Sequence, residues 1–592
     1  MMQLTLDQFD ESDDDYGSDD SYIPEEDHLS DSDHDSGSEI DVNDVISVSD
    51  DEEAAGSVQR GGNEAVTEPV EVFYGKKNCF AWSSIPPNLG SKAPQKNVIK
   101  IRLSSWLGPA NHLGTHPKPV DIWRLFFCDE ILDEVVKHTN AKLEAMRGKL
   151  QNPSSNYKNT DRTEIEALIG LMILCCIFKS GRESLASRFS NDCTGRPIFR
   201  GTMSQKRCDV LLVALRFDDS STREERRGHD PAAAVSNIFS IFTAICQKVY
   251  SIGAHACVDE TLIPFRGRCR FRMYMPSKPA KYGIKVICLT DAHSSYLYNA
   301  YIYVGKDSDG ATLSEEEKKF TKPTQAVIRL SKCLYGSNRN ITADNWFSSI
   351  ELAQELLKHK LTYVGTVKSN KREIPLEFLP SRHKEVGSMM YGFTKDLTLL
   401  SFVPKKSKSV IVLSTMHHSE FADQKSNKPE MISFYNSTKS GIDTLDMKCS
   451  NYSANRRTRR WPLAIFYYLI SVSCSNAYVM YLHKGKLTRF EFMKSIGISL
   501  VREHMKTRLQ IPNLPDDLRK IISNTLGEEQ REETGAEKIQ TKERSDKLEK
   551  RKNCRYCPYS VNRMTAYKCI KCETPNCLQC SKKLCKVCVE NL

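Results

Sequence analysis

The chain has 592 residues, of which 40% are hydrophobic, enough for several folded units with their own cores. Its formal charge of +9 is unevenly distributed, because residues 1–59 contain 21 Asp and Glu and no Lys or Arg. The other 54 acids and 84 bases give residues 60–592 a charge of +30, typical of proteins that bind polyanions. The first residues lack the basic start and apolar run of a secretory signal, which argues against a secreted, disulfide-stabilised protein.

Residues 1–107 are predicted to form a disordered acidic region. They are rich in Asp, Ser and Gly and poor in aromatic residues, so they bury too little apolar surface to offset ordering entropy. Ser18 and Ser49 stand in acidic clusters that suit an acid-directed kinase, which is therefore an expected partner. A tail that only interacts with water is the alternative.

Two stretches, residues 108–254 and 456–530, are predicted to be helical. In the first, apolar residues recur at helical spacing from Ile122, and Ile165–Phe178 is a dense apolar helix. In the second, Trp461–Leu482 is about as long as a membrane span, but several serines and an asparagine interrupt it. We therefore interpret it as a buried helix and expect no membrane partner.

Between the helical stretches the pattern changes to short β-rich runs that later alternate with helices. This order predicts a mixed sheet covered by helices over residues 255–370 and 434–455. The lysine-rich residues 371–433 are predicted to be a β-rich insertion, and residues 531–553 a charged linker. The predicted strands are Ala256–Ile263, Gly283–Thr290, Tyr296–Val304, Asn340–Ala343 and Leu361–Val367.

Eight cysteines form four Cys-x-x-Cys pairs at the end of the chain, over residues 554–592. Eight thiolates suit two tetrahedral Zn²⁺ sites, and so short a segment hardly folds without metal. The spacing favours a cross-braced finger, with a sequential ribbon as the alternative. In the cross-brace one zinc takes Cys554, Cys557, Cys577 and Cys580, and the other takes Cys569, Cys572, Cys585 and Cys588. The basic segment Lys547–Arg555 is a candidate nuclear import signal.

Three aspartates stand in strongly patterned stretches far apart in the sequence. Asp259 lies in Val-Asp-Glu-Thr-Leu-Ile-Pro-Phe-Arg-Gly, Asp344 in Asp-Asn-Trp-Phe-Ser-Ser, and Asp443 in Ser-Gly-Ile-Asp-Thr-Leu-Asp. The first two are predicted on or just after strands, and Asp446 follows Asp443 by one helical turn. Carboxylates that converge in this way can hold the two Mg²⁺ ions used in phosphoryl transfer. Glu260 should point to the other face of its strand and is not counted as a ligand.

Two basic segments follow the first and third aspartates. Residues 265–285 interleave cations with aromatic residues, which predicts phosphate contacts beside the metals; a solvated hairpin is the alternative. Residues 455–462 crowd arginines at the start of a helix, where the dipole disfavours cations unless an anion is near. Trp461 is either a base-stacking residue or a core residue. The candidate DNA contacts are Arg266, Arg268, Arg270, Arg272, Lys278, Lys281, Lys285, Arg456, Arg457, Arg459, Arg460 and Trp461.

These motifs, with Tyr-Met-Pro-Ser-Lys-Pro-Ala-Lys-Tyr-Gly-Ile-Lys and Gly-Thr-Val-Lys-Ser-Asn-Lys-Arg-Glu-Ile-Pro, resemble the piggyBac transposases from about Asp121 to the C-terminus. The resemblance implies a multidomain α+β protein with a ribonuclease H-like catalytic core, an inserted β-rich domain and a cross-braced zinc finger. Residues 108–254 and 456–530 would form one all-α DNA-binding and dimerisation domain. One departure is Ser440-Gly441, where a Gly-Gly pair is common.

The resemblance also implies an activity and its residues. It assigns catalysis and Mg²⁺ binding, with Mn²⁺ as a substitute, to Asp259, Asp344, Asp443 and Asp446. It adds Lys368, Asn370, Lys371 and Arg372 to the candidate DNA contacts. The expected protein is a nuclear homodimer that acts on double-stranded DNA: it cuts terminal inverted repeats flanked by TTAA, passes through hairpins and seals the donor. A domesticated descendant that binds DNA or chromatin without cutting is the alternative.

In this family the cysteine module recognises DNA near the element ends. Related transposases often carry His where Cys580 stands, a replacement that preserves zinc binding.

Overall fold

The computed structural model describes residues 70–87, 117–420, 428–483, 485–533, 547–569 and 574–581. The chain divides into two compact units, Met1–Ile522 and Ser523–Leu592. The first unit contains a long mixed sheet and most of the helices, and the second contains a short β-hairpin.

Five strands form the centre of the sheet in the spatial order β6-β5-β3-β7-β8. The antiparallel pairs β3/β5 and β5/β6 are followed by the parallel pairs β3/β7 and β7/β8. A short strand, β4 (Arg272–Tyr274), pairs with β5 beyond them. The five strands are β3 (His255–Pro264), β5 (Tyr282–Asp291), β6 (Leu297–Ile302), β7 (Asn340–Ala343) and β8 (Thr362–Thr366). The mixed α/β sheet expected from the sequence is therefore present.

Four helices that follow or separate these strands pack against the sheet. Helices α10 (Lys322–Ser331) and α11 (Ile350–Lys358) contact each other as well as β5 and β8. Helix α12 (Glu430–Thr438) contacts β3, β8 and β11, and α13 (Gly441–Asn451) contacts β3 and β5. The chain thus returns to the central strands after the insertion, and α13 brings the third aspartate to them.

The β-rich insertion continues the same sheet. Strands β9 (Met389–Phe393), β10 (Thr398–Lys405) and β11 (Lys408–Ser414) pair antiparallel in the order β9-β10-β11, and β11 pairs with β8. Their apolar side chains share a core with α12, which includes Phe393, Leu400, Val412, Ile432 and Tyr435. The insertion is β-rich as predicted, but it extends the central sheet.

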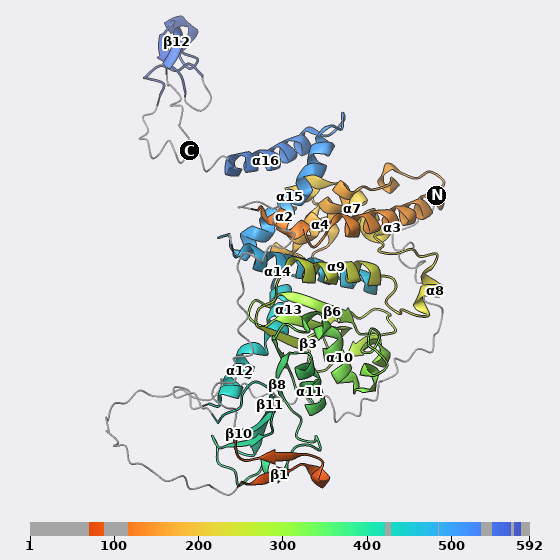
Figure 1. Ribbon diagram of the computed structural model, residues 1–592. Helices are drawn as coiled ribbons and strands as arrows, with labels where there is room; N and C mark the ends of the chain where they lie inside the picture. The colour runs from red at the N-terminus through yellow and green to blue at the C-terminus, as the bar shows by residue number, and fades with distance from the viewer. Residues whose placement is uncertain are drawn as a thin grey trace, which may run out of the picture. The chain divides into compact units, whose positions relative to one another are not determined.

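A further hairpin forms the edge beyond the insertion. Strands β1 (Val72–Tyr74) and β2 (Ala81–Ser83) pair with each other, and Ser83 pairs with Phe393 of β9 (Figure 1). The expectation of disorder throughout residues 1–107 is therefore wrong for this stretch. Partners almost 300 residues away stabilise it, so the local composition gives little sign of it.

The helical part is built from both ends of the first unit. Figure 1 shows α9 (Ser236–Val249) and α14 (Trp461–Tyr481) between the sheet and helices α2, α3, α4 and α7. Helix α9 contacts β6, and α14 contacts β3. The indole Nε1–H of Trp123 on α2 donates to Ser473 Oγ on α14 at 2.9 Å. Helices α4 (Arg162–Ile177) and α15 (Arg489–Leu509) cross closely at Gly170 and Gly497. A Cβ added at Gly170 would lie only 3.0 Å from Gly497 O. The two predicted helical stretches therefore pack as one body.

The helices of that body begin before the sheet and resume after α13. The earlier ones are α2 (Pro119–Arg124), α3 (Asp129–Gly148), α4 (Arg162–Ile177), α5 (Leu185–Arg188), α6 (Pro197–Thr202), α7 (Gln205–Ala214), α8 (Arg223–Arg227) and α9 (Ser236–Val249). The later ones are α14 (Trp461–Tyr481) and α15 (Arg489–Leu509), and α16 (Asp516–Glu533) runs into the second unit. Among the described residues, α14 is the one helix long and apolar enough to cross a membrane. In its most apolar 18-residue stretch, 94% is buried inside the protein. This burial favours the core helix expected from the sequence.

The second unit contains the antiparallel pair β12 (Lys547–Asn553) and β13 (Met564–Tyr567). Strand β12 begins within the stretch expected to be a charged linker, residues 531–553, so part of that stretch is folded.

Candidate active site

Two of the candidate aspartates are placed side by side by parallel strands. Val258 of β3 pairs with Ala343, the last residue of β7, so Asp259 on β3 and Asp344 just after β7 occupy neighbouring positions. Burial, followed by repulsion from Glu260, Asp344 and Asp443, raises the pKa of Asp259 well above its ordinary value. The negative charges of three segments therefore meet at Asp259.

The other two aspartates lie in the first two turns of α13. A Cβ added at Gly441 would lie 2.4 Å from Thr290 Oγ1 and 3.1 Å from Cys257 Cβ, so only glycine lets this helix approach β3 and β5 so closely. Ser440, just before the helix, has φ −88° and needs no glycine. The Ser-Gly departure from the family pattern is therefore compatible with the helix start.

Asp446 is fixed by a neighbour that the sequence reasoning missed. The hydroxyl of Thr261 on β3 donates to Asp446 Oδ1 at 2.6 Å. Burial raises the pKa of Asp446 to about 6, although Thr261 and Lys278 act in the opposite direction. Thr261 stands two residues after Asp259 on the same strand face, and this spacing was the only sequence signal for it.

Lys278, predicted as a DNA contact, lies at the acidic centre. Its Nζ donates to the carbonyl of Glu260 at 3.0 Å and lies 3.9 Å from Glu260 Oε1. Burial acts to lower the pKa of Lys278, but the carboxylates of Asp259, Glu260, Asp443 and Asp446 outweigh it and leave the pKa raised. The Glu260 carboxylate therefore pairs with two lysines, because Lys285 Nζ also lies 4.0 Å from its Oε2.

The turn that carries Asp344 is held by two hydroxyls. Ser348 Oγ donates to the Asp344 carbonyl at 2.8 Å and lies 2.5 Å from the buried Tyr363 hydroxyl. The backbone N–H of Trp346 donates to Asp344 Oδ1 at 3.0 Å. Ser348 and Trp346 were part of the Asp-Asn-Trp-Phe-Ser-Ser motif, but their roles depend on contacts that the sequence does not show.

The donor chemistry of the four aspartates fits hard divalent cations, which prefer carboxylate oxygens. Added positive charge would relieve the repulsion that raises the pKa of Asp259. Among the described residues, only a cysteine group has all its ligand atoms within 4.8 Å of one another. Within the described residues, the aspartate oxygens are therefore more widely spaced than the four thiols of that cysteine group.

The two basic segments contact each other. A Cβ added at Gly267 would lie 2.8 Å from the Arg459 carbonyl oxygen, and Phe271 packs edge-on against Trp461 with ring centroids 5.0 Å apart. Trp461 is 3% exposed, so its ring does not face solvent. Of the two roles considered for it, base stacking and core packing, the structure therefore favours core packing. The exposed cations of this region are Arg266, Arg268, Arg270, Lys281, Arg457 and Arg459.

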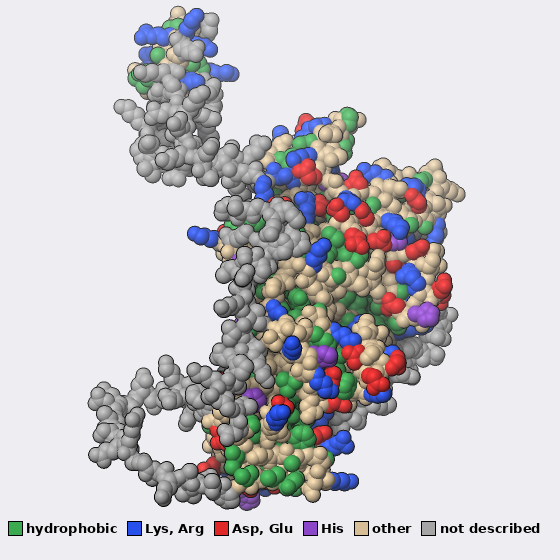
Figure 2. Space-filling model, in the orientation of Figure 1, with side chains coloured by type: hydrophobic (Ala, Val, Ile, Leu, Met, Phe, Trp, Pro, Cys, Tyr) green, Lys and Arg blue, Asp and Glu red, His purple; other side chains and the backbone are tan. Residues whose placement is uncertain are grey.

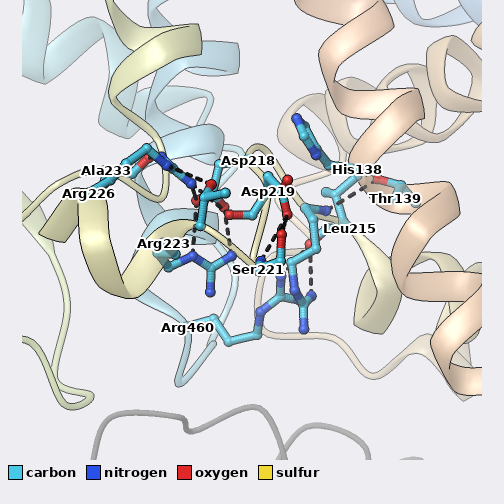
Figure 3. Close-up of polar contacts among 12 residues, drawn as sticks. His138, Thr139, Leu215, Asp218, Asp219, Ser221, Arg223, Arg226, Ala233 and Arg460 are labelled. Atoms are coloured by element: carbon cyan, nitrogen blue, oxygen red, sulfur yellow. Dashed lines mark hydrogen bonds and ion pairs between the residues drawn. The ribbon is translucent and has the colours of Figure 1, made fainter.

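Several other candidate cations have partners within the protein. Arg272 donates to the carbonyls of Arg266 and Gly267, and Lys285 is 5% exposed. Arg460 donates to the carbonyl of Leu215, just after α7 (Figure 3). It also donates to the carbonyls of Leu212 and Val213 in the last turn of α7. Arg456 is half-buried. Burial raises the pKa of Asp209, and the charge of Arg456 offsets part of this rise.

The Arg460 contact lies in a wider polar network. Asp218 accepts hydrogen bonds from Arg223 and Arg226, which fixes the loop around α8 (Figure 3). Across the helical part, Figure 2 shows described Lys and Arg side chains interspersed with Asp and Glu on the face drawn. The charge of that face is therefore mixed.

The remaining candidate DNA contacts follow β8. Lys368 Nζ lies 4.9 Å from the Trp346 ring centroid, which links it to the Asp344 turn. Asn370 and Arg372 are exposed, and the Arg372 side chain is 78% exposed. Lys371 is half-buried.

In the second unit, four cysteines form a candidate zinc site. The Sγ atoms of Cys554, Cys557, Cys577 and Cys580 lie within 4.8 Å of one another, with Cys557 3.7 Å from Cys577 and 3.6 Å from Cys580. A tetrahedral Zn²⁺ with Zn–S bonds of about 2.3 Å has S–S edges of about 3.8 Å, so the spacing fits. The Cys577 N–H donates to Cys554 Sγ at 3.3 Å and lowers the pKa of Cys554, which favours the ligating thiolate.

Cys569 lies outside this group of four. Cys572, Cys585 and Cys588 fall outside the described residues.

Comparisons with known proteins place the chain in a family. A profile of the family described as Transposase IS4 matches residues 118–478, more than half of the chain. Human PiggyBac transposable element-derived protein 3 is 21% identical over 382 residues, which cover 61% of this chain and 61% of that protein. The human element-derived protein 5 is 21% identical over 415 residues, which cover 67% of this chain and 77% of that protein. The chain therefore spans about three fifths of the first of these relatives.

A solved structure gives a broader match. The cryo-EM structure of a piggyBac transposase synaptic complex with hairpin DNA has a TM-score of 0.66 to this chain at 36% sequence identity. The match covers 81% of this chain and 98% of that one. The chain belongs to the Transposase IS4 family, in its piggyBac type.

Proposed function

We propose that this protein is a cut-and-paste DNA transposase that nicks element ends, forms hairpins and integrates at TTAA by two-metal phosphoryl transfer. The observation that carries the proposal is the meeting of Asp259, Asp344 and Asp443 from β3, β7 and α13, with Asp446 one turn away. The order of the five central strands, three antiparallel and then two parallel, supports a ribonuclease H-like core.

Asp259, Asp344, Asp443 and Asp446 would hold two Mg²⁺ ions, with Mn²⁺ as a substitute. Bound there, the ions would activate the attacking oxygen and stabilise the leaving oxygen of the phosphate. Thr261 holds the Asp446 carboxylate in place, and Ser348 holds the backbone of the Asp344 turn. Lys278 offsets part of the carboxylate charge from the side of the β3–β5 hairpin. These contacts fix the acids before DNA arrives, as a preorganised phosphoryl-transfer site requires.

The partner that we propose is double-stranded DNA with TTAA-flanked inverted repeats, bound by a nuclear homodimer. The structural relative was solved as a synaptic complex with hairpin DNA, which supports DNA binding and assembly. The contacting basic segments around Gly267 and Arg459 would bring phosphates beside the aspartates.

The cysteine module would be a cross-braced finger with two Zn²⁺ per chain that recognises DNA near the element ends. The grouping of Cys554, Cys557, Cys577 and Cys580 supports the cross-brace, because a sequential ribbon would join the first pair to Cys569 and Cys572. The second ion would then use Cys569, Cys572, Cys585 and Cys588.

A domesticated protein that binds DNA without cutting it is the second candidate. It is favoured by the names of the human relatives, which describe them as derived from transposable elements. The retained aspartates favour the enzyme, because a protein that only binds DNA has no physical need for an acidic cluster that repels phosphate.

The test is cleavage of a duplex that carries the TTAA-flanked repeat bordering this coding sequence. We expect Mg²⁺-dependent nicking followed by hairpin formation. Replacing Asp259, Asp344 or Asp443 by Asn should abolish cutting and leave DNA binding intact. Binding of the repeat without any cutting by the unmodified protein would instead establish the second candidate.

A further inference from the structure

The β1–β2 hairpin, residues 72–83, holds a basic turn of the insertion. We use the name basic turn for residues 368–373, which follow β8 and include Lys368, Lys371 and Arg372. Three carbonyls of this turn accept hydrogen bonds from the hairpin. Lys76 Nζ donates to Asn370 O at 3.4 Å, Lys76 N–H to Arg372 O at 2.6 Å, and Trp82 Nε1–H to Glu373 O at 2.9 Å.

Burial makes this contact a fixed part of the fold. Trp82 is 0% exposed, and Phe73 packs edge-on against Phe378 with ring centroids 5.5 Å apart. A Cβ added at Gly75 would lie 2.7 Å from Arg372 O, so the backbones touch directly. Burial of an indole and a phenyl ring stabilises one position of the hairpin on the turn.

The hairpin also presents cations of its own. Lys76 and Lys77 are exposed, and neither forms an ion pair with an acid in the described part of the chain. Lys77 has φ 57°, a conformation that favours glycine, and it holds its side chain at the tip of the hairpin. In the basic turn the Arg372 side chain is 78% exposed, with its Nε 3.5 Å from Glu373 Oε1, and the Arg372 carbonyl accepts the Lys76 N–H.

This surface is connected to the candidate active site. Lys368, at the start of the basic turn, has its Nζ over the Trp346 ring, and the backbone N–H of Trp346 donates to the Asp344 carboxylate. A polyanion on Lys76, Lys77 and Arg372 can thus continue along the protein toward the aspartates. A DNA strand has the required repeating charge and length, whereas a small anion would not link the two places.

We propose that the hairpin and the basic turn form one surface that binds the phosphate backbone of DNA, with contacts from Lys76, Lys77 and Arg372. Trp82 is a positioning residue, because it orients the turn through the Glu373 carbonyl. The inference rests on the proposed function for its partner, and it adds to that function an N-terminal element outside the residues matched by the family profile, 118–478.

The experiment measures binding of the full-length protein to two fluorescent DNA duplexes of unrelated sequence, without divalent cations, over a series of salt concentrations. The variants are Lys76→Gln/Lys77→Gln and the same pair combined with Arg372→Gln. The matched control is Lys318→Gln/Lys319→Gln, because these lysines also lie together in a 3-10 helical region, and they pair with Glu315 and Glu316.

Each lost phosphate contact should lower the slope of log affinity against log salt by about 0.9. We therefore expect a reduction of about 1 to 2 for the lysine pair, a larger one for the triple variant, and the same loss on both duplexes. The control should keep the slope of the unmodified protein.

The outcomes separate this inference from the proposed function. If the unmodified protein binds and cuts DNA but the lysine pair keeps its slope, the hairpin surface is wrong and the function stands. If slopes fall as expected and no cutting occurs, the surface stands and the cleavage proposal fails. If the unmodified protein binds neither duplex, the sequence-independent phosphate surface is wrong, and the proposed function still depends on cleavage of the TTAA-flanked repeat. For Trp82→Phe, which keeps an aromatic ring and loses the N–H donor, we expect a lower slope from protein that is still folded at the temperature of the binding measurement. A slope equal to that of the unmodified protein would show that Trp82 does not position the basic turn.

Discussion

Thr261 and Asp446 are joined by a hydrogen bond of 2.6 Å between residues 185 positions apart in the sequence. The bond connects the strand that carries Asp259 to the helix that carries Asp443. Because both ends belong to elements bearing candidate ligands, this bond helps to set the distance between them. It also gives the half-buried Asp446 carboxylate a hydrogen-bond donor.

Thr261→Val should therefore reduce DNA cleavage while leaving DNA binding unchanged. Valine keeps the shape of threonine and removes the donor, so Asp446 is free to turn away from its position. A displaced ligand of this kind costs on the order of 10- to 100-fold in rate. Cleavage is measured on the TTAA-flanked duplex, and Thr261→Ser, which keeps the hydroxyl, should restore it. A valine variant as fast as the unmodified protein would show that the bond has no role in positioning.

Gly441→Ala should displace α13 and lower cleavage by a similar factor. The new Cβ would lie 2.4 Å from Thr290 Oγ1, which is buried. Removing the obstacle with Thr290→Ala should recover part of the activity in the double variant, because the remaining contact with Cys257 at 3.1 Å is milder. Gly148→Ala is the control, since nothing lies within 4 Å of a Cβ there. Failure of the double variant to recover would place the defect elsewhere.

The sequence was most informative where local pattern and site chemistry coincide. Alternating and continuous apolar runs predicted β3, β5, β6, β7 and β8 closely, because buried strands leave a strong local signal. The positions of the aspartates after or within those runs supported the expectation that they would meet.

The sequence was least informative where a distant partner decides the structure. The three-residue strands β1 and β2 gain stability from Glu373 and Phe393, which no local pattern announces. The sequence predicts Arg460 as a DNA contact, whereas in the structure its guanidinium donates to carbonyls about 245 residues away. A basic residue looks the same in sequence whether it meets a phosphate or a helix end, since both offer acceptor oxygens.

The stability of the helical body should depend strongly on one buried ion pair. Glu164 and Arg207 are both buried and lie 2.6 Å apart. Glu164→Gln should destabilise the protein by roughly 3 to 5 kcal/mol, because it leaves a buried guanidinium without its counterion. Asp133→Asn breaks an exposed pair with Arg162 and should cost much less, because water screens the charges of that pair. Urea denaturation of the two variants checks the contrast, and equal losses would contradict it.

His417 predicts a loss of stability at mildly acidic pH. It is 7% exposed, with Nδ1 2.7 Å from Ser414 Oγ, and burial followed by the charge of His418 lowers its pKa to about 4. An unfolded histidine has a pKa of about 6.5, so between pH 6.5 and 4 the unfolded chain binds a proton that the folded chain does not. This contribution is fully present above pH 6.5 and falls by about 3 kcal/mol as pH drops to 4.

The measurement is the urea midpoint at pH 7 and pH 5 for the unmodified protein and for His417→Gln. The variant should lose less stability between the two pH values. The exposed His383→Gln serves as the control and should behave like the unmodified protein. An unchanged pH response in His417→Gln would assign the acid sensitivity to other groups.

Zinc content can decide how the cysteine pairs share their ions. Under the cross-brace, Cys554 and Cys577 hold the same ion, as their places in the four-thiol cluster favour. Cys554→Ala, Cys577→Ala and the double variant should then each retain about one Zn²⁺ per chain out of about two. In a sequential ribbon the two cysteines serve different ions, so the double variant would lose both. Cys580→His should keep about two ions, because imidazole replaces thiolate in tetrahedral zinc sites. Elemental analysis of full-length protein purified without chelator gives these numbers, and a double variant without zinc would overturn the cross-brace.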